Sequence, residues 1–143
     1  MTRDHSSATA EIRLQSLQET QIENASIVVL NYTLQFIPDK ERLKILTHIA
    51  RGLVPGGILI LSEKIRFMDE AIQSATTELH HAFKKHQGYS DLEIAQKRAS
   101  LENVLVPNTL EQHQERLRDA GFISSDMFLK CFNFVSLIAI KQR

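Results

Sequence analysis

The stretch Ser26-Ile-Val-Val-Leu-Asn31 decides the fold. It is β-branched and continuously apolar after the serine, and such a run is typical of a parallel strand covered on both faces. An amphipathic segment follows over residues 38–53, and a second apolar run follows over residues 58–61. Strand, helix and strand in this order predict a βαβ unit with parallel pairing and a right-handed crossover.

The predicted helix of this unit carries its own boundary signals. Asp39 follows Pro38 and is expected to cap the start of the helix, while Gly52 is expected to supply a left-handed residue at its end. The tripeptide Pro55-Gly56-Gly57 is then expected to turn the chain before the second strand. It precedes a strand, so we interpret it as a turn and not as a ligand-binding loop.

The remainder of the chain predicts further helices and a terminal pair of strands. Ser90 and Glu93 have the spacing of a capping box, as do Thr109 and Gln112, so each pair marks a helix start. The periodicity predicts three helices and two strands, over residues 67–87, 91–103, 109–121, 122–130 and 134–140. Residues 1–10 are expected to be disordered, and residues 11–15 fit a short strand as well as a helix running through Leu17. Together the elements predict one α/β domain over residues 1–143.

Composition excludes several classes of partner. Lys plus Arg and Asp plus Glu number 17 each, so the chain has no net basic charge for direct nucleic-acid binding. A single cysteine, Cys131, cannot form an internal disulfide, which indicates a reducing, cytoplasmic setting. No apolar run approaches the roughly 18 residues of a membrane span. His80, His81 and His86 do not present a metal-binding spacing, because adjacent histidines on a helix diverge by roughly 100°.

Polar residues end both strands of the βαβ unit. Asn31 follows the first strand and Ser62-Glu63-Lys64 follows the second, and ligands of open α/β sheets bind beyond the carboxyl ends of the strands. Asn31 can both donate to and accept from a ligand, although it could equally cap the turn into the next helix. Glu63 and Lys64 have the same two interpretations, as site residues or as partners of solvent and a neighbouring helix.

Longer strings resemble one family. IENASIVVLNYTLQFI (22–37), LVPGGILILSEKIRF (53–67), ELHHAFKKHQGYSDLEIAQKR (78–98), LENVL (101–105) and LKCFNFVSLIAIK (129–141) closely resemble the bacterial carboxy-S-adenosyl-methionine synthases. These are methyltransferase-like enzymes of tRNA wobble-uridine modification. The resemblance runs from about residue 22 to 141, and the string GYSDLEIAQKR is its most specific part. It implies an incomplete methyltransferase-like (Rossmann-like) open sheet, mostly parallel, with an antiparallel C-terminal hairpin and a helical insertion at 67–105 that dimerises.

The resemblance also implies a reaction and two binding residues. The family makes carboxy-S-adenosylmethionine from S-adenosylmethionine and prephenate, releasing phenylpyruvate and carbon dioxide. Asn31 would contact the cofactor. Arg98 would reach across a homodimer interface to the added carboxylate, which suits a guanidinium. No catalytic residue with a covalent role is implied, and the competing interpretation of Arg98 is a solvated helix arginine.

Part of the family pattern is absent from this sequence. Family members carry roughly a hundred earlier residues, including a glycine-rich cofactor loop, and none of the five glycines here forms a G-x-G after a strand. Ser16 stands where the family would have an acidic residue, so that role is not transferred. We therefore expect the chain alone to be inactive and to bind the cofactor weakly. The alternatives are a non-catalytic dimerisation or regulatory remnant and another S-adenosylmethionine-dependent methyltransferase.

The missing part has a structural consequence as well. In the methyltransferase-like sheet the strand at residues 26–31 pairs with a strand that this sequence lacks, so it would present an apolar edge. The segment 11–15 could move beside it, a second chain could cover it, or the isolated chain could be poorly stable. We favour a homodimer, because the helices at 67–87 and 91–103 also need a partner for their apolar faces.

Overall fold

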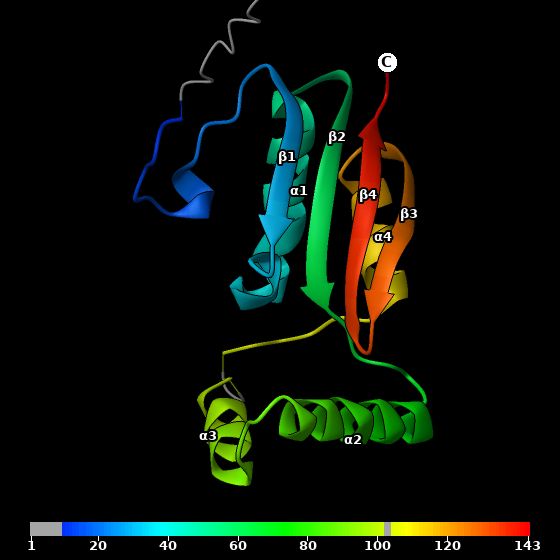
Figure 1. Ribbon diagram of the computed structural model, residues 1–143. Helices are drawn as coiled ribbons and strands as arrows, with labels where there is room; N and C mark the ends of the chain where they lie inside the picture. Colours follow the sequence, from blue (N-terminus) through cyan, green and yellow to red (C-terminus); the bar gives the residue numbers. More distant parts are fainter. Residues whose placement is uncertain (1–9, 102–103) are drawn as a thin grey trace, which may run out of the picture.

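The computed structural model describes residues 10–101 and 104–143 and contains a four-stranded sheet in the order β1-β2-β4-β3 (Figure 1). The strands are β1 (Ala25–Asn31), β2 (Leu53–Lys64), β3 (Phe122–Cys131) and β4 (Phe134–Lys141). The helices are α1 (Asp39–Gly52), α2 (Glu70–His86), α3 (Asp91–Leu101) and α4 (Leu110–Asp119), with short 3-10 turns η1 (Leu17–Glu19) and η2 (Leu34–Phe36). The expected α/β class, with a βαβ unit and a terminal hairpin, is confirmed.

The sheet is mixed in its pairing. β1 and β2 are parallel, with Ile27 beside Ile58 and Asn31 beside Ser62. β4 is antiparallel to both of its neighbours, β2 and β3. Three strands therefore point the same way and only β4 is reversed, which places the ends of β1 and β2 at one edge of the sheet.

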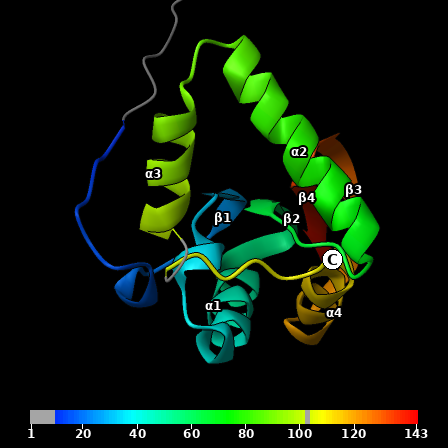
Figure 2. The ribbon, with the colours of Figure 1, turned by 90° about the horizontal axis from the view of Figure 1, so that it is seen from below.

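Only one face of the sheet is covered by the described residues. α1 and α4 pack together on this face (Figures 1 and 2). The fully buried apolar side chains of this layer are Leu34, Leu46, Ile49, Leu59, Leu61, Leu117, Leu137 and Ala139. On the opposite face Ile27 and Val29 remain 60% and 52% exposed. The expectation that this strand is covered on both faces is therefore wrong for this chain, and the exposed edge expected at residues 26–31 is present.

The helical insertion lies beyond the carboxyl ends of β1 and β2 (Figure 1). α2 starts one turn later than expected, because the Asp69 carboxylate accepts from the Ile72 N–H and caps it. The capping boxes at Ser90 and Thr109 both form as expected. Residues 102 and 103, which close the expected second helix, lie outside the described residues.

Four local expectations are wrong. Pro55-Gly56-Gly57 does not precede the second strand but lies within β2, which begins at Leu53. Residues 10–16 form neither strand nor helix, and a single 3-10 turn follows at Leu17–Glu19; the expected disorder of residues 1–9 lies outside the described residues. Asp39 is the first residue of α1 and not its cap, which is Pro38. Gly52 ends α1 without a left-handed φ. It is needed for close approach instead, because a Cβ there would lie 2.1 Å from the carbonyl oxygen of Ile22.

Candidate functional site

Asn31 lies at the end of β1 with its side chain exposed. Its backbone carbonyl accepts from the Thr33 hydroxyl at 3.0 Å, and the next residue, Tyr32, has a φ of 52° and donates to the Ser62 carbonyl. Asn31 does not cap the following turn, because the N–H groups of that turn bond elsewhere. Its amide therefore stays available at the ligand edge of the sheet.

Glu63, and not Asn31, caps the turn that follows β1. Its carboxylate is fully buried and accepts from the backbone N–H groups of Leu34 at 3.0 Å and Gln35 at 2.9 Å. Burial raises the pKa of Glu63 to about 7, against the opposing effect of these two hydrogen bonds. Glu63 therefore fixes the turn after Asn31 from the helix-covered side of the sheet, and its role is that of a turn cap.

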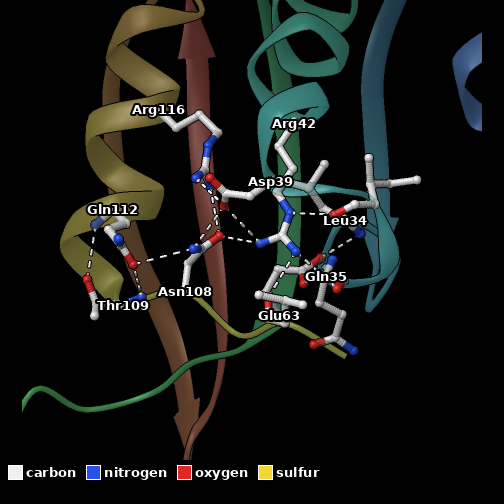
Figure 3. Close-up of polar contacts among 11 residues, drawn as sticks. Leu34, Gln35, Asp39, Arg42, Glu63, Asn108, Thr109, Gln112 and Arg116 are labelled. Carbon is white, nitrogen blue, oxygen red and sulfur yellow. Dashed lines mark hydrogen bonds and ion pairs between the residues drawn. The ribbon is translucent and has the colours of Figure 1, made fainter. Parts of the chain in front are cut away.

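Arg42 is the centre of a buried polar clamp (Figure 3). It is fully buried on α1 and donates to the carbonyls of Ile37 at 2.8 Å, Gln35 at 3.1 Å and Val106 at 2.9 Å. It also donates to the side-chain oxygen of Asn108. Arg42 thus joins the turn after β1 to the segment that leads from the insertion into α4.

Asp39 and Arg116 complete the clamp on its exposed side. The Asp39 carboxylate lies 3.0 Å from Arg116 and 3.6 Å from Arg42. Arg116 and Arg42 both donate to Asn108, whose amide donates to Asp39 (Figure 3). The clamp therefore ties α1 and α4 to one end of the helical insertion, and it positions the base of that insertion below the sheet edge.

A pocket of about 320 Å³ lies between the sheet edge and the insertion. Arg98 of α3 and Lys64 at the end of β2 both line it. Its remaining lining comes from α2, α3, the segment before α4 and the β3–β4 turn: Gln73, Thr77, His80, His81, Lys84, Ile94, Lys97, Leu101, Leu105, Pro107 and Asn133. Burial lowers the pKa of Lys64, and the nearby charges of Lys84 and Arg98 lower it further. The pocket is therefore strongly cationic.

Aromatic rings pack around one side of this pocket. The His80 ring lies 5.2 Å from the Phe134 ring and 5.4 Å from the Phe132 ring. Tyr32, next to Asn31, packs edge-on against Phe134 at 5.8 Å. Burial, then Lys84 and Lys64, lower the pKa of His80 and favour its neutral form. This cluster connects the Asn31 edge to the pocket.

The structure does not bring Asn31 and Arg98 into one pocket within the chain, since Asn31 is absent from the lining that contains Arg98. Lys64 connects the two regions, because it lies two residues beyond Ser62, the partner of Asn31 in the sheet. His113, on α4, is buried, and burial lowers its pKa to about 4. The part of the chain that the structure describes holds no cluster of three or more His, Cys, Asp or Glu side chains suited to a metal.

Sequence reasoning missed the clamp and Asn133. One signal for Arg42 was available, because it is spaced four and seven residues from Leu46 and Ile49 and so lies on the core face of α1. A charge at such a position indicates a buried, paired group. Asn108 and Asn133 carry no comparable signal, since their burial depends on segments far away in the sequence.

Structural comparison defines the class of the fold. The chain superposes on human N-acetylserotonin methyltransferase in complex with SAM with a TM-score of 0.60 at 17% identity, over 92% of this chain and 33% of that one. The structure of PigF with SAH gives a TM-score of 0.59 at 19% identity, over 86% of this chain and 32% of that one. The fold is that of the S-adenosylmethionine-dependent methyltransferases. No family model matches the chain, and none of the described helices is long and apolar enough to cross a membrane.

Sequence comparison is more specific. The carboxy-S-adenosyl-L-methionine synthase of Geobacter metallireducens is 61% identical over 125 residues, which cover 87% of this chain and 51% of that protein. The synthase of Hahella chejuensis is 55% identical over 141 residues, covering 99% and 57%. The chain is a homologue of the carboxy-S-adenosyl-L-methionine synthases, and it spans about half the length of these curated relatives.

Proposed function

We propose that this chain forms the C-terminal part of a carboxy-S-adenosyl-L-methionine synthase that acts in the cytoplasm in tRNA wobble-uridine modification. The proposed reaction takes S-adenosylmethionine and prephenate and yields carboxy-S-adenosylmethionine, phenylpyruvate and carbon dioxide. The observation that carries the proposal is the identity of more than half of the aligned residues to curated relatives with this name.

The residues present fit part of a cofactor site. The exposed amide of Asn31 can hydrogen-bond a nucleoside cofactor beyond the sheet edge, and Arg98 can bind a carboxylate with two parallel hydrogen bonds. None of the five glycines provides a loop for close approach to the cofactor. In this proposal a further segment, like the other half of the relatives, completes the site and covers the open face of the sheet.

A homodimer is part of the proposal. Ile72, Leu79 and Phe83 form an exposed apolar stripe on α2, spaced by seven and four residues, and Leu92 is exposed on α3. Burying such a stripe against a second copy would bring Arg98 of each protomer to the partner's cofactor. A monomer at micromolar concentration in sedimentation analysis would refute this cross-subunit role of Arg98.

The same exposed surfaces favour one alternative, a non-catalytic assembly module. The two functions are distinguished by mixing this chain with the complementary half of the Geobacter metallireducens relative, then adding S-adenosylmethionine and prephenate. Mass spectrometry should detect carboxy-S-adenosylmethionine from the mixture and none from either half alone. Arg98→Gln should abolish the product, whereas Arg118→Gln, on the exposed side of α4, should not. No product from a mixture that assembles, while the intact relative is active, would favour the assembly module.

A further inference from the structure

The backbone of Gln35 joins the turn after β1 to three other parts of the chain. Gln35 lies in η2 and is 5% exposed. Its N–H donates to the Glu63 carboxylate at 2.9 Å (Figure 3). Its carbonyl accepts from Arg42 at 3.1 Å and from the Val106 N–H at 3.2 Å. Gln35 is therefore tied to β2, to α1 and to the segment that leads from the insertion into α4.

The side-chain amide of Gln35 spans the point where β1 and β2 separate. The pairing of these strands reaches Asn31 and Ser62, and the Tyr32 N–H adds one more bond to the Ser62 carbonyl. Alternate residues of a strand direct their N–H groups to the same neighbour, so Lys64 faces the side that β1 has left. There the Lys64 N–H donates to Oε1 of Gln35 at 3.0 Å, and Nε2 of Gln35 donates to the Tyr32 carbonyl at 3.5 Å. The amide thus takes the place of a strand residue.

These two contacts require opposite chemistry. The Lys64 N–H needs an acceptor and the Tyr32 carbonyl needs a donor, and a neutral primary amide supplies one of each. A carboxylate in the same place would offer acceptors only, and it would lie close to the buried carboxylate of Glu63. The two contacts therefore fix the orientation of the amide, and with it the spacing of the two strand ends.

We propose that Gln35 is a positioning residue for the cofactor site. Its side-chain amide holds the turn after β1 against the end of β2, and so sets the place of Asn31, which directly precedes Tyr32 and has an exposed side chain. Gln35 itself is buried, so its influence on a ligand beyond the sheet edge passes through Asn31. The identity of that ligand rests on the proposed function, whereas the link between the two strand ends can be tested without it.

Hydrogen exchange on the full chain, followed by NMR, tests the link. In the unaltered chain the Lys64 N–H should be protected. Gln35→Met keeps the length of the side chain but removes its donor and its acceptor. In this variant the Lys64 N–H should exchange about fivefold to tenfold faster relative to the Ile60 N–H, which lies opposite Val29 in the middle of the sheet.

Calorimetry on the assembled mixture of this chain with the complementary half of the Geobacter metallireducens relative tests the positioning role. Gln35→Met should weaken the binding of S-adenosylmethionine about fivefold to tenfold, because Asn31 is displaced. Gly52→Ala is the matched control, since Gly52 directly precedes Leu53, which pairs with Ala25 at the far end of β1. It should lower the melting temperature and leave the affinity unchanged, because a loss of folded protein reduces the number of binding sites and not their affinity.

Two results would overturn the inference. One is a Lys64 N–H that exchanges as freely as an exposed amide in the unaltered chain, a measurement that depends on no variant and on no second half. The other is equal affinity of the unaltered and the Gln35→Met mixtures for S-adenosylmethionine. Product formation together with equal affinities would refute this inference alone. The difference in affinity without any product from S-adenosylmethionine and prephenate would refute only the proposed function.

Discussion

Glu63→Gln should change how the stability of the chain depends on pH. Glu63 is fully buried and its pKa is raised to about 7 in the folded state, from 4.5 for the free side chain. Between these values the folded chain binds a proton that the unfolded chain releases. The stabilisation from protonated Glu63 is therefore complete below about pH 4.5 and is lost as the pH rises through about 7.

The size of this effect follows from the difference in pKa. Each unit corresponds to about 1.4 kcal/mol, so the raised pKa of Glu63 is equivalent to roughly 3 kcal/mol between pH 4.5 and 7. Glutamine keeps the size of the side chain and one acceptor oxygen but does not titrate. Relative to Glu63→Gln, the unaltered chain should lose roughly 3 kcal/mol of stability across this interval.

His113 should conceal this effect in the unaltered chain. Its pKa falls from 6.5 to about 4 because its neutral form is buried. The stabilisation from neutral His113 is complete above about pH 6.5 and is lost as the pH falls through about 4. The two groups therefore have opposite slopes over nearly the same interval. The unaltered chain should show a shallow profile there, and Glu63→Gln should reveal the histidine as a loss of stability at lower pH.

Urea unfolding followed by circular dichroism at pH 4.5, 5.5, 6.5 and 7.5 measures the difference. Glu115→Gln, at an exposed position of α4, is the matched control and should run parallel to the unaltered chain. The reasoning is refuted if the free energies of unfolding of the unaltered chain and Glu63→Gln keep a constant difference, to within about 1 kcal/mol, from pH 4.5 to 7.5.

Three further substitutions test the clamp, the buried histidine and the close approach at the end of α1. Arg42→Met should lower the free energy of unfolding by about 3–5 kcal/mol in urea titrations, because it leaves buried acceptors unpaired, whereas Arg118→Met should change it by less than about 0.5 kcal/mol. His113→Leu should leave stability at pH 7 unchanged or higher, because both ring nitrogens lack partners among the described residues; a large loss would contradict this. Gly52→Ala should cost about 1–3 kcal/mol, because its Cβ would overlap the Ile22 carbonyl, and an unchanged melting temperature would disprove that contact.

Local signals in the sequence were sufficient for most elements of the fold. The apolar runs at residues 26–31 and 58–61 gave the parallel pair, and the capping boxes at Ser90 and Thr109 located two helix starts. These signals work because caps and periodicity depend on residues a few positions apart. The prediction for residues 11–15 was wrong because it used only local signals. A weak alternation of apolar and polar residues forms a strand only when a neighbouring strand pairs with it.

The site depended on contacts between distant residues, which the sequence does not reveal. From the sequence, Glu63 could be a site residue or a partner of solvent and a neighbouring helix. In the structure its carboxylate accepts hydrogen bonds from Leu34 and Gln35, about thirty positions away. Asn133 appeared only as part of a family string. It is buried in the turn between β3 and β4, and its side-chain oxygen has no partner among the described residues; both are tertiary properties.

Within the proposed enzyme, this chain positions the helical insertion but does not provide the loop that would approach the cofactor. The clamp around Arg42 holds the base of the insertion from within this chain, through the carbonyl of Val106 and the side chain of Asn108. The loop that would approach the cofactor has no counterpart among the five glycines, and the described residues leave one apolar face of the sheet uncovered. Under the proposed function, the insertion that carries Arg98 is therefore held by this chain, whereas tight cofactor binding requires the part that covers that face. The chain alone should then bind S-adenosylmethionine weakly in calorimetric titration, and tight binding would contradict this division.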